Sequence, residues 1–215
     1  MKAEFSANGF ELFTVQCDVT KTGAIDSFAK AVVKNFGGID VWVNNAGITI
    51  SRKPFYEYTD EEFNRLIDTN LKSVFMGAAV ASKYMRDRGG VIINTSSFTG
   101  VVPTCGAAVY GAIKAAVDSL TKTMAGELAP FGIRVVAVSP AYVLTPMAAE
   151  NIGTDREMMI SKIPLRRLAT VEDVSGVYTF LATEEASYIN GVSIPVTGGK
   201  MSVQNPMWNW ERLEK

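Results

Sequence analysis

Tyr110 and Lys114 are four residues apart in a segment whose apolar pattern predicts a helix, and Ser97 lies thirteen residues before Tyr110. Side chains at positions i and i+4 of a helix share one face, so the ammonium group can come close to the phenol. A nearby cation favours the phenolate and lowers a tyrosine pKa from its usual value near 10. The spacing therefore predicts a proton donor with its own activator, and Ser97 is the nearest group that could polarise a substrate oxygen.

Histidine is absent from the sequence, which removes every Ser-His-Asp, Cys-His or histidine-ligated metal scheme. Acid-base chemistry must then fall to tyrosine, lysine or a carboxylate. A Tyr-x-x-x-Lys pair alone is a weak signal, because both residues are common on helix surfaces and a solvated lysine beside a packed tyrosine is the ordinary alternative. The pair becomes a functional hypothesis only together with the other motifs of the chain.

Composition favours one globular domain. The chain has 215 residues, 47% of them apolar, and a net charge of −1 without a basic stripe for nucleic acid. Cys17 and Cys105 are too few for a disulfide scaffold and lack metal-ligand spacing, so no metal site is expected and a reducing cytoplasm fits best. The first ten residues match neither a signal peptide nor an anchor, and the longest central apolar run, 74–81, is far shorter than the about 20 residues of a membrane span. We expect a single cytoplasmic domain over 1–215, with 201–215 as a C-terminal tail.

Short β-rich runs alternate along the chain with segments of helical periodicity. Strands are predicted at 12–19, 39–43, 91–95, 133–138 and 193–196, and helices at 20–36, 59–88, 107–131 and from 170 to about 182. The central runs are almost continuously apolar, which is typical of strands buried on both faces. This alternation predicts right-handed βαβ units around a parallel sheet, with ligand-binding groups at the carboxyl ends of the strands. The polar motifs of the sequence fall at those ends.

Several motifs occur in the order typical of one enzyme family. They are Asp18, the turn Asn44-Asn45-Ala46-Gly47, Asn70, Ser97, Tyr110, Lys114, the turn Ser139-Pro140 and Thr145. With these motifs the chain resembles the short-chain dehydrogenase/reductase family from about residue 12 to residue 199. The resemblance implies an α/β fold with a Rossmann-like, doubly wound parallel sheet. It also implies an oxidoreductase that uses NAD or NADP to interconvert a small alcohol and its ketone or aldehyde by hydride transfer.

The same resemblance implies a catalytic tetrad. Tyr110 would be the acid in carbonyl reduction and the base in alcohol oxidation, while Lys114 would lower its pKa and bind the nicotinamide ribose. Ser97 would hold and polarise the substrate oxygen. Asn70 would bind a water that links Lys114 to solvent, although an asparagine within a helix otherwise indicates a solvated position.

Cofactor and substrate contacts also follow from the resemblance. Asp18 would accept a hydrogen bond from the adenine amino group, although an aspartate after a strand is often only a helix cap. The implied cofactor contacts are Asp18, Asn44, Ala46, Gly47, Tyr110, Lys114, Pro140, Val143 and Thr145. The implied substrate pocket, beneath a mobile lid at 141–164, is lined by Phe98, Cys105, Tyr142 and Met147. Ala141 departs from the Pro-Gly that is usual in the family.

One part of the family pattern is not found in the sequence. The family begins with a strand, a turn of the Thr-Gly-x-x-x-Gly-x-Gly kind, a helix and a second strand, and no segment of this chain supplies that turn. We therefore expect an N-terminally truncated fold without the first two strands and the first helix, in which the cofactor diphosphate loses its cradle of backbone N–H groups. The strand at 39–43 would keep an unpaired edge unless the strand at 12–19 pairs with it. NAD and NADP are not distinguished, because the discriminating residue would end the second strand.

Two functional hypotheses follow. The first is an active short-chain dehydrogenase/reductase, and the second is a non-catalytic relative that serves as an assembly or binding module because the diphosphate loop is missing. A homodimer or homotetramer is expected, because the helices at 59–88 and 107–131 carry apolar positions on more than one face and family relatives pair these helices. The expected partner is a small-molecule alcohol or carbonyl substrate, with no nucleic acid and no membrane.

Overall fold

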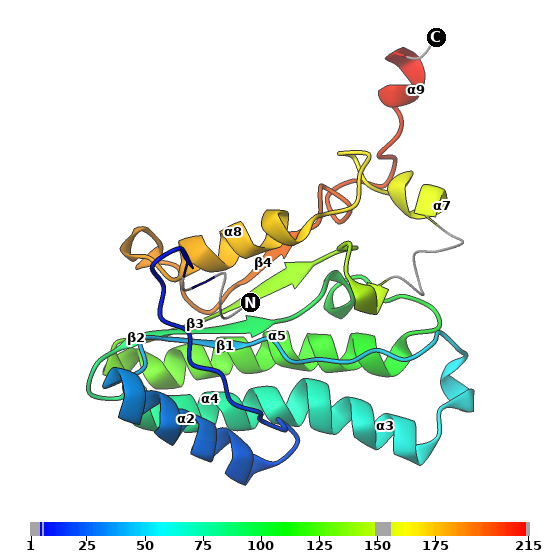
Figure 1. The fold of residues 1–215 in the computed structure, drawn as a ribbon. Helices are drawn as coiled ribbons and strands as arrows, with labels where there is room; N and C mark the ends of the chain where they lie inside the picture. Colours follow the sequence, from blue (N-terminus) through cyan, green and yellow to red (C-terminus); the bar gives the residue numbers. More distant parts are fainter. Residues whose placement is uncertain (1–4, 6, 149–155, 214–215) are drawn as a thin grey trace.

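A parallel sheet forms the centre of the molecule in the computed structural model, which describes residues 5, 7–148 and 156–213 (Figure 1). Within these residues the sheet has four strands, β1 (Val41–Asn44), β2 (Gly90–Thr95), β3 (Ile133–Pro140) and β4 (Ser193–Val196), in the order β1-β2-β3-β4. In the register, Val43 pairs with Ile93 and Ile93 pairs with Val136. This is the α/β, Rossmann-like arrangement predicted from the alternation of strands and helices.

Helices cover both faces of the sheet (Figure 1). One face is covered by α2 (Thr22–Phe36), α4 (Ser73–Met85) and α5 (Ala108–Leu128), and the other by α8 (Val171–Leu181). The predicted helix 59–88 is present as α3 (Asp60–Ile67) followed by a π-helical turn at Asp68–Lys72 and then by α4. The short helices α7 (Arg156–Ile160) and α9 (Trp210–Leu213) occur in the C-terminal part. None of the described helices is long and apolar enough to cross a membrane.

Alternating side chains of the central strands fill two hydrophobic cores. Ile92 and Val135 pack on the side of α2, α4 and α5, where Trp42 joins them. Ile93, the next residue along β2, packs on the opposite side with Leu181 of α8. Both isoleucines are fully buried. Burial of successive residues is the pattern of a strand covered on both faces, and it places the carboxyl ends of β2 and β3 firmly within the molecule.

The predicted helix starts at Thr59 and Thr170 are confirmed. Each threonine accepts a hydrogen bond from the backbone N–H of the third helical residue, Glu62 or Asp173, whose carboxylate accepts from the threonine N–H in return. Such a capping box satisfies N–H groups that the first turn of a helix leaves without partners. Gly37 ends α2 with a φ of 81°, a left-handed conformation that glycine adopts without strain.

The predicted strand at 12–19 is not formed. These residues are described but take no strand conformation, and within the described part of the chain β1 pairs only with β2. The expectation that 12–19 might pair with β1 is therefore wrong too. A β-rich segment needs the N–H and C=O groups of a neighbour to become a strand, and local composition does not supply them. Val41 and Val43 consequently stay 41% and 44% exposed at an open sheet edge.

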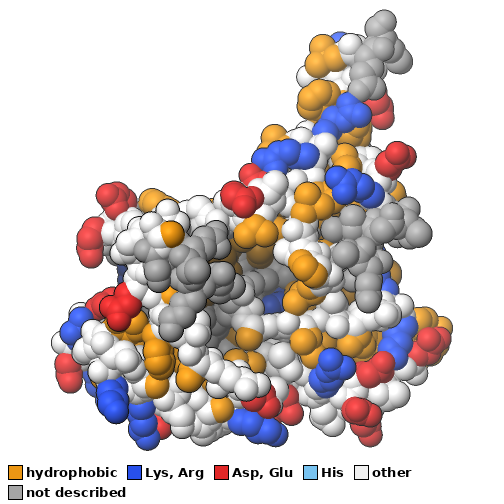
Figure 2. Space-filling view, in the orientation of Figure 1, with side chains coloured by type: hydrophobic (Ala, Val, Ile, Leu, Met, Phe, Trp, Pro, Cys, Tyr) orange, Lys and Arg blue, Asp and Glu red, His pale blue; other side chains and the backbone are white. Residues whose placement is uncertain are grey.

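The C-terminal tail extends away from the sheet and ends in α9 (Figure 1). Trp210 Nε1 donates a hydrogen bond to the carbonyl oxygen of Pro164 at 3.0 Å, and the guanidinium of Arg166 lies 5.0 Å from the centroid of the same ring. The other tail tryptophan, Trp208, is 60% exposed. Figure 2 shows hydrophobic and charged side chains together on this projection. The tail therefore contacts the segment around Pro164 through one tryptophan.

Replacement of a residue in the core beneath α8 tests the two-sided packing of the sheet. Ile93→Ala is expected to lower the free energy of unfolding by about 2–5 kcal/mol, because it leaves a cavity between β2 and α8. Val43→Ala, at the open edge of the same sheet, is the matched control and should cost less than about 1 kcal/mol. Denaturant unfolding followed by circular dichroism measures both. Equal losses would show that the face under α8 is not a packed core.

Candidate active site

Tyr110 and Lys114 lie in the first turns of α5, and Ser97 follows the carboxyl end of β2. After β2 the chain turns into a short 3₁₀-helix, Phe98–Gly100, which Ser97 caps. Gly100 lets this turn lie against α5, since a β-carbon at this position would come within 2.8 Å of the α5 backbone. The close approach of turn and helix brings Ser97 beside Tyr110, where the serine hydroxyl favours the charged form of the phenol. The two elements thus join the three residues that the sequence singled out.

Lys114 is almost completely buried, with 4% of its surface exposed. Its Nζ donates a hydrogen bond to the carbonyl oxygen of Thr95 at 2.7 Å and lies 5.4 Å from the centroid of the Tyr110 ring. Burial lowers the pKa of Lys114 to about 8, and the carboxylate of Asp118, one turn along α5, partly opposes this shift. The amine is therefore held beside Tyr110 in a form that exchanges its proton near neutral pH.

The protonation of Tyr110 differs from the prediction. Burial raises the pKa of its phenol, and the nearby Ser97 hydroxyl opposes the rise. The predicted lowering of this pKa by Lys114 is wrong in this structure, because the ammonium group donates to the Thr95 carbonyl and the desolvation of the phenolate dominates. Tyr110 is consequently a neutral hydroxyl at physiological pH, which is the form required of a proton donor.

Ser97 is 7% exposed and its hydroxyl oxygen has two donors. The Thr99 backbone N–H donates to Ser97 Oγ at 3.3 Å, and the Thr99 hydroxyl donates to the same atom at 3.0 Å. A serine hydroxyl offers two lone pairs and one proton, so these contacts occupy the lone pairs and leave the proton for Tyr110 or for a substrate oxygen. Thr99 therefore positions Ser97 as a donor.

Asn70 lies in the π-helical turn between α3 and α4 and is 1% exposed. Its Oδ1 accepts a hydrogen bond from the Ile48 N–H at 2.8 Å, and its Nδ2 donates to the Ile48 carbonyl at 3.0 Å. Gly47 fits against it, since a β-carbon there would come 2.9 Å from Asn70 Oδ1. The solvated alternative for Asn70 is therefore wrong, and its side chain fastens the loop after β1. The water that it would hold for Lys114 stays a prediction.

Asn44 uses its side chain within the protein. Its Oδ1 accepts from Trp42 Nε1 at 2.8 Å, and its Nδ2 donates to Asn94 Oδ1 at 2.9 Å. Asn94 in turn donates to Thr121 Oγ1 of α5 at 3.0 Å. This chain of hydrogen bonds joins β1, β2 and α5 just below the site. Asn44 thus stabilises the sheet with its side chain, and its contact with a cofactor stays a prediction.

Asp18 is exposed and forms a local turn at the entrance of α2. Its Oδ1 accepts from the Thr20 N–H at 2.9 Å and from the Thr20 hydroxyl at 2.7 Å. These hydrogen bonds hold the pKa of the Asp18 carboxyl below its usual range. Asp18 does not cap α2, because the N-cap of that helix is Lys21 and has no side-chain cap hydrogen bond. The alternative of a helix cap is therefore wrong, and the contact of Asp18 with an adenine stays a prediction.

The other implied cofactor residues occupy two places. Ala46 follows β1 and lines a cavity of about 120 Å³ together with Asn44, Asn45, Cys17 and Val19, among others. Pro140 ends β3, Val143 forms an isolated bridge with Ala169, and Thr145 accepts from the Ala148 N–H at 3.0 Å. Both places lie after the carboxyl ends of strands, as expected for ligand-binding groups in a parallel sheet.

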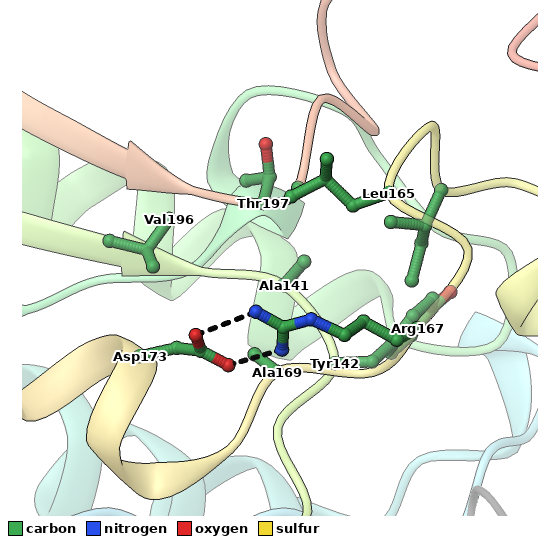
Figure 3. Close-up of a pocket in the computed structure, with 10 residues that line it drawn as sticks. Ala141, Tyr142, Leu165, Arg167, Ala169, Asp173, Val196 and Thr197 are labelled. Carbon is green, nitrogen blue, oxygen red and sulfur yellow. Dashed lines mark hydrogen bonds and ion pairs between the residues drawn. The ribbon is translucent and has the colours of Figure 1, made fainter.

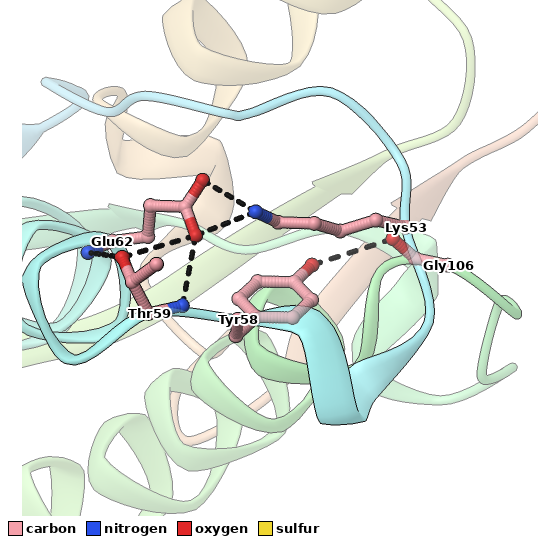
Figure 4. A network of polar contacts seen from close by, with 5 residues as sticks. All are labelled: Lys53, Tyr58, Thr59, Glu62 and Gly106. Atoms are coloured by element: carbon pink, nitrogen blue, oxygen red, sulfur yellow. Dashed lines mark hydrogen bonds and ion pairs between the residues drawn. The ribbon is translucent and has the colours of Figure 1, made fainter.

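A polar network fixes the loop that leads into α5 (Figure 4). The Tyr58 hydroxyl donates to the Gly106 carbonyl at 3.3 Å, and the Lys53 backbone N–H donates to the same oxygen at 3.1 Å. Lys53 Nζ lies 2.6 Å from the carboxylate of Glu62, which also accepts from the Thr59 N–H. The network ties the start of α3 to the residues just before α5, so the helix that carries Tyr110 begins at a defined point.

Two of the four predicted substrate-pocket residues are brought together. The rings of Phe98 and Tyr142 meet edge-on with centroids 5.3 Å apart, and Phe98 is buried. Tyr142 also lines a cavity of about 140 Å³ that is bounded by the ion pair of Arg167 with Asp173 (Figure 3). Cys105 is exposed and Met147 is 49% exposed, and neither lines that cavity. Their part in a pocket stays a prediction.

The predicted lid at 141–164 is described only in part, since 149–155 lie outside the described residues. Beyond that gap, Met159 and Ile163 are buried in a small cluster with Leu168, and Tyr142 packs against it. This part of the segment packs against its own first residues and against Leu168, which follows it. Its motion as a lid stays a prediction.

Sequence reasoning missed Thr95, Thr99 and Asp118. Thr95 acts through its backbone carbonyl, which every residue has, so the residue type gave no signal. Thr99 lies two residues after Ser97, a spacing at which hydroxyl side chains often bond locally. Asp118 lies four residues after Lys114 on one helix, a readable signal for a charge pair. One oxygen of the Asp118 carboxylate is buried without a hydrogen-bond partner among the described residues.

Comparison with known proteins gives consistent matches. The family model described as enoyl-(acyl carrier protein) reductase matches residues 2–201. The 3-oxoacyl-[acyl-carrier-protein] reductase FabG of Staphylococcus epidermidis is 40% identical over 197 residues, which cover 91% of this chain and 80% of the relative. The 4-formylbenzenesulfonate dehydrogenase of Comamonas testosteroni is 40% identical over 190 residues, covering 86% and 75%. The crystal structure of a short-chain type dehydrogenase/reductase from Mycobacterium marinum superposes with a TM-score of 0.87 at 37% identity, covering 94% and 80%.

The lowered pKa of Lys114 predicts a pH-dependent stability. Between about pH 8 and the unfolded value of about 10.4 the unfolded chain binds more protons at Lys114, so this residue makes the free energy of unfolding rise with pH. Lys114→Met removes the contribution of this residue to the pH dependence of the free energy of unfolding. Its stability relative to the wild type should fall by about 2 kcal/mol from about pH 7 to about pH 9.5. Denaturant midpoints measure this, and Lys122→Met, which removes an exposed lysine of α5, is the control. The same pH response in both variants would contradict the assignment.

The fold, the site and the comparisons agree. The tyrosine and lysine on α5 and the serine after β2 stand in the chain order that the resemblance implied, at the carboxyl edge of a parallel sheet. The family model matches residues 2–201, and a relative of which the chain covers 80% is 40% identical to it over the matched 197 residues. The chain therefore belongs to the short-chain dehydrogenase/reductase family of oxidoreductases.

Proposed function

We propose that this oxidoreductase interconverts a small alcohol and its ketone or aldehyde, with NAD or NADP as the hydride carrier. The observation that carries the proposal is the meeting of Ser97, Tyr110 and the buried Lys114 at the carboxyl edge of the sheet. These side chains supply a hydroxyl that can bind an oxygen, a proton donor and a cation, within a site largely closed to water. Those are the groups that a carbonyl oxygen needs while it becomes an alcohol.

The residues around the site fit a nicotinamide dinucleotide. Lys114 has three N–H donors and, among the described residues, one acceptor in the Thr95 carbonyl, so it can also bind ribose hydroxyls. The cavity beside Asn45 and Ala46 offers space for part of the adenosine at the end of β1. When bound, the dinucleotide supplies or takes up the hydride.

The protein would then handle the proton. In carbonyl reduction, Ser97 donates a hydrogen bond to the substrate oxygen and stabilises the negative charge that develops there. Tyr110, kept neutral by burial, donates its proton to the same oxygen; in the reverse direction, alcohol oxidation, only its phenolate form accepts the proton. Lys114 can return a proton to the resulting phenolate, because its pKa of about 8 lies close to physiological pH and below that of the phenol. Asn70 holds the loop after β1 in place through its two hydrogen bonds with Ile48.

The relatives support the reaction more than any single substrate. One is named for a 3-oxoacyl group on an acyl carrier protein and another for 4-formylbenzenesulfonate, and both names contain a carbonyl group. The remainder of the two substrates has nothing in common. We therefore extend to this chain only the carbonyl or alcohol function at the reacting carbon.

The alternative of a non-catalytic binding module is less well supported. It was suggested by the absence of a Thr-Gly-x-x-x-Gly-x-Gly turn from the sequence, and no comparison establishes that a unit is missing from the protein. Burying a lysine beside a tyrosine destabilises a fold, because the ammonium group loses its hydration. A non-catalytic module would lose stability through this buried lysine without any gain in function.

Dinucleotide binding is the first test. A ligand that binds only the folded state stabilises it by about 2.7 kcal/mol at a hundredfold excess over its Kd, which corresponds to a rise in Tm of several degrees for a chain of this size. We expect at least one of NAD⁺, NADH, NADP⁺ and NADPH, each at about 1 mM, to produce such a rise in a thermal shift assay. The absence of any shift with all four would contradict the proposal for this chain.

Removal of the phenolic hydroxyl tests the proton donor. Tyr110→Phe is expected to lower kcat about 10²–10⁴-fold for a carbonyl compound that the wild type reduces, while the rise in Tm with dinucleotide is retained. The matched control is Tyr188→Phe, which removes a hydroxyl from a fully exposed tyrosine and should leave kcat unchanged. Steady-state rates of nicotinamide absorbance measure both. Wild-type turnover by Tyr110→Phe would refute the assigned role.

A further inference from the structure

Lys200 lies over both aromatic rings of the predicted substrate pocket. Its Nζ is 5.2 Å from the ring centroid of Phe98 and 5.2 Å from that of Tyr142. The two rings contact each other edge-on, so the ammonium group sits over their junction. Lys200 lies in the turn after β4, next to Gly198 and Gly199. Its backbone N–H donates a hydrogen bond to the Thr197 carbonyl. Lys200 is not among the site residues predicted from the sequence.

The charge of Lys200 has no counter-ion in the described part of the chain. No carboxylate lies within ion-pair distance of its Nζ there, whereas the other cation near it is Lys162. Burial and the charge of Lys162 both lower the pKa of Lys200, which shows that the protein environment penalises its charged form. Contacts with two rings contribute only about 0.5–1 kcal/mol each at a partly exposed position. An anion at this place would be attracted by both lysines.

Lys200 contacts two rings whose chain segments lie next to Ser97 and just after the end of β3. Phe98 is the residue next to Ser97, and Tyr142 lies two residues after Pro140 at the end of β3. Both rings therefore belong to the segments that border the proton-donating hydroxyls. A molecule whose carbonyl oxygen is held by Ser97 and Tyr110 would extend its other end along these rings toward the ammonium group.

We propose that Lys200 is a specificity residue that binds an anionic group, a carboxylate or a sulfonate, carried by the substrate beyond its reacting carbonyl or alcohol carbon. This inference rests on the proposed function, since it concerns the substrate of the same site. The ring of Tyr142, which packs on the buried Phe98, contacts the apolar part of the substrate, and Lys200 pairs with the anionic end. The attraction is strengthened by the partial burial of the ammonium group.

Paired substrates test the charge preference. The probes are 4-formylbenzoate and its uncharged methyl ester, which share the aldehyde and the aromatic ring, assayed with the reduced dinucleotide that stabilises the protein. The wild type is expected to show a kcat/KM about tenfold or more higher for the carboxylate, equivalent to about 1.4 kcal/mol. Lys200→Met should lose this preference by lowering kcat/KM for the carboxylate only, and Lys200→Arg should keep most of it. Lys122→Met removes an exposed lysine of α5 as the control and should behave like the wild type.

Binding without turnover separates this proposal from the proposed function. Calorimetric titrations use 4-(hydroxymethyl)benzoate and 4-(hydroxymethyl)benzamide, with and without reduced dinucleotide, a combination that cannot react because both partners are already reduced. If the carboxylate binds and Lys200→Met weakens this binding about tenfold, the anion site is supported. If no aldehyde is turned over in the same protein, only the proposed function is overturned. Turnover that is equal for the acid and the ester and insensitive to Lys200→Met would overturn the anion site alone. If there is no turnover and also no binding that depends on Lys200, both the proposed function and the anion site are overturned.

Discussion

Lys114 carries an amine into a part of the molecule that is nearly closed to water, and much of the neighbouring structure compensates for that placement. The cost of desolvating an ammonium group is several kcal/mol in a protein interior. The Thr95 carbonyl and the Asp118 carboxylate offset part of it, and the remainder is expressed as a pKa of about 8. The same burial keeps the phenol of Tyr110 neutral. Burial therefore has two effects near neutral pH. It keeps Tyr110 protonated, and it gives Lys114 a pKa at which the amine exchanges its proton.

Buried and half-buried amide side chains hold the frame around this lysine. Asn44 and Asn94 connect β1, β2 and α5, and Asn70 connects the π-helical turn to the loop after β1. An amide left without its hydrogen bonds in the interior costs about 1–3 kcal/mol, so each of these side chains tolerates only one arrangement of the elements that it joins. Apolar contacts alone would permit small shifts between strand ends and helices. The bond of Asn94 with Thr121 holds β2 against α5, the helix that carries Tyr110 and Lys114.

Most of the fold could be predicted from the sequence, because local signals and global packing agree in it. Thr59 and Thr170 mark helix starts, and the apolar runs of β2 and β3 match strands buried on both faces. The strand expected at 12–19 failed because strand formation depends on a neighbour, and composition does not reveal one. The grouping of Ser97, Tyr110 and Lys114 could be predicted from chain order and helical spacing. The direction of the Tyr110 pKa could not, since it depends on burial and on where the lysine directs its proton.

The protonation of Lys114 is the most direct measurement of the central claim, and it needs no substrate. Lysine ammonium signals can be followed by ¹⁵N NMR from about pH 6 to about pH 10 in the wild type and in Lys114→Met, which identifies the signal by its loss. The account predicts that this signal titrates near pH 8, as burial beside Tyr110 requires. A signal that titrates at the ordinary lysine value of about 10.4 would show that the amine is solvated and would contradict the account.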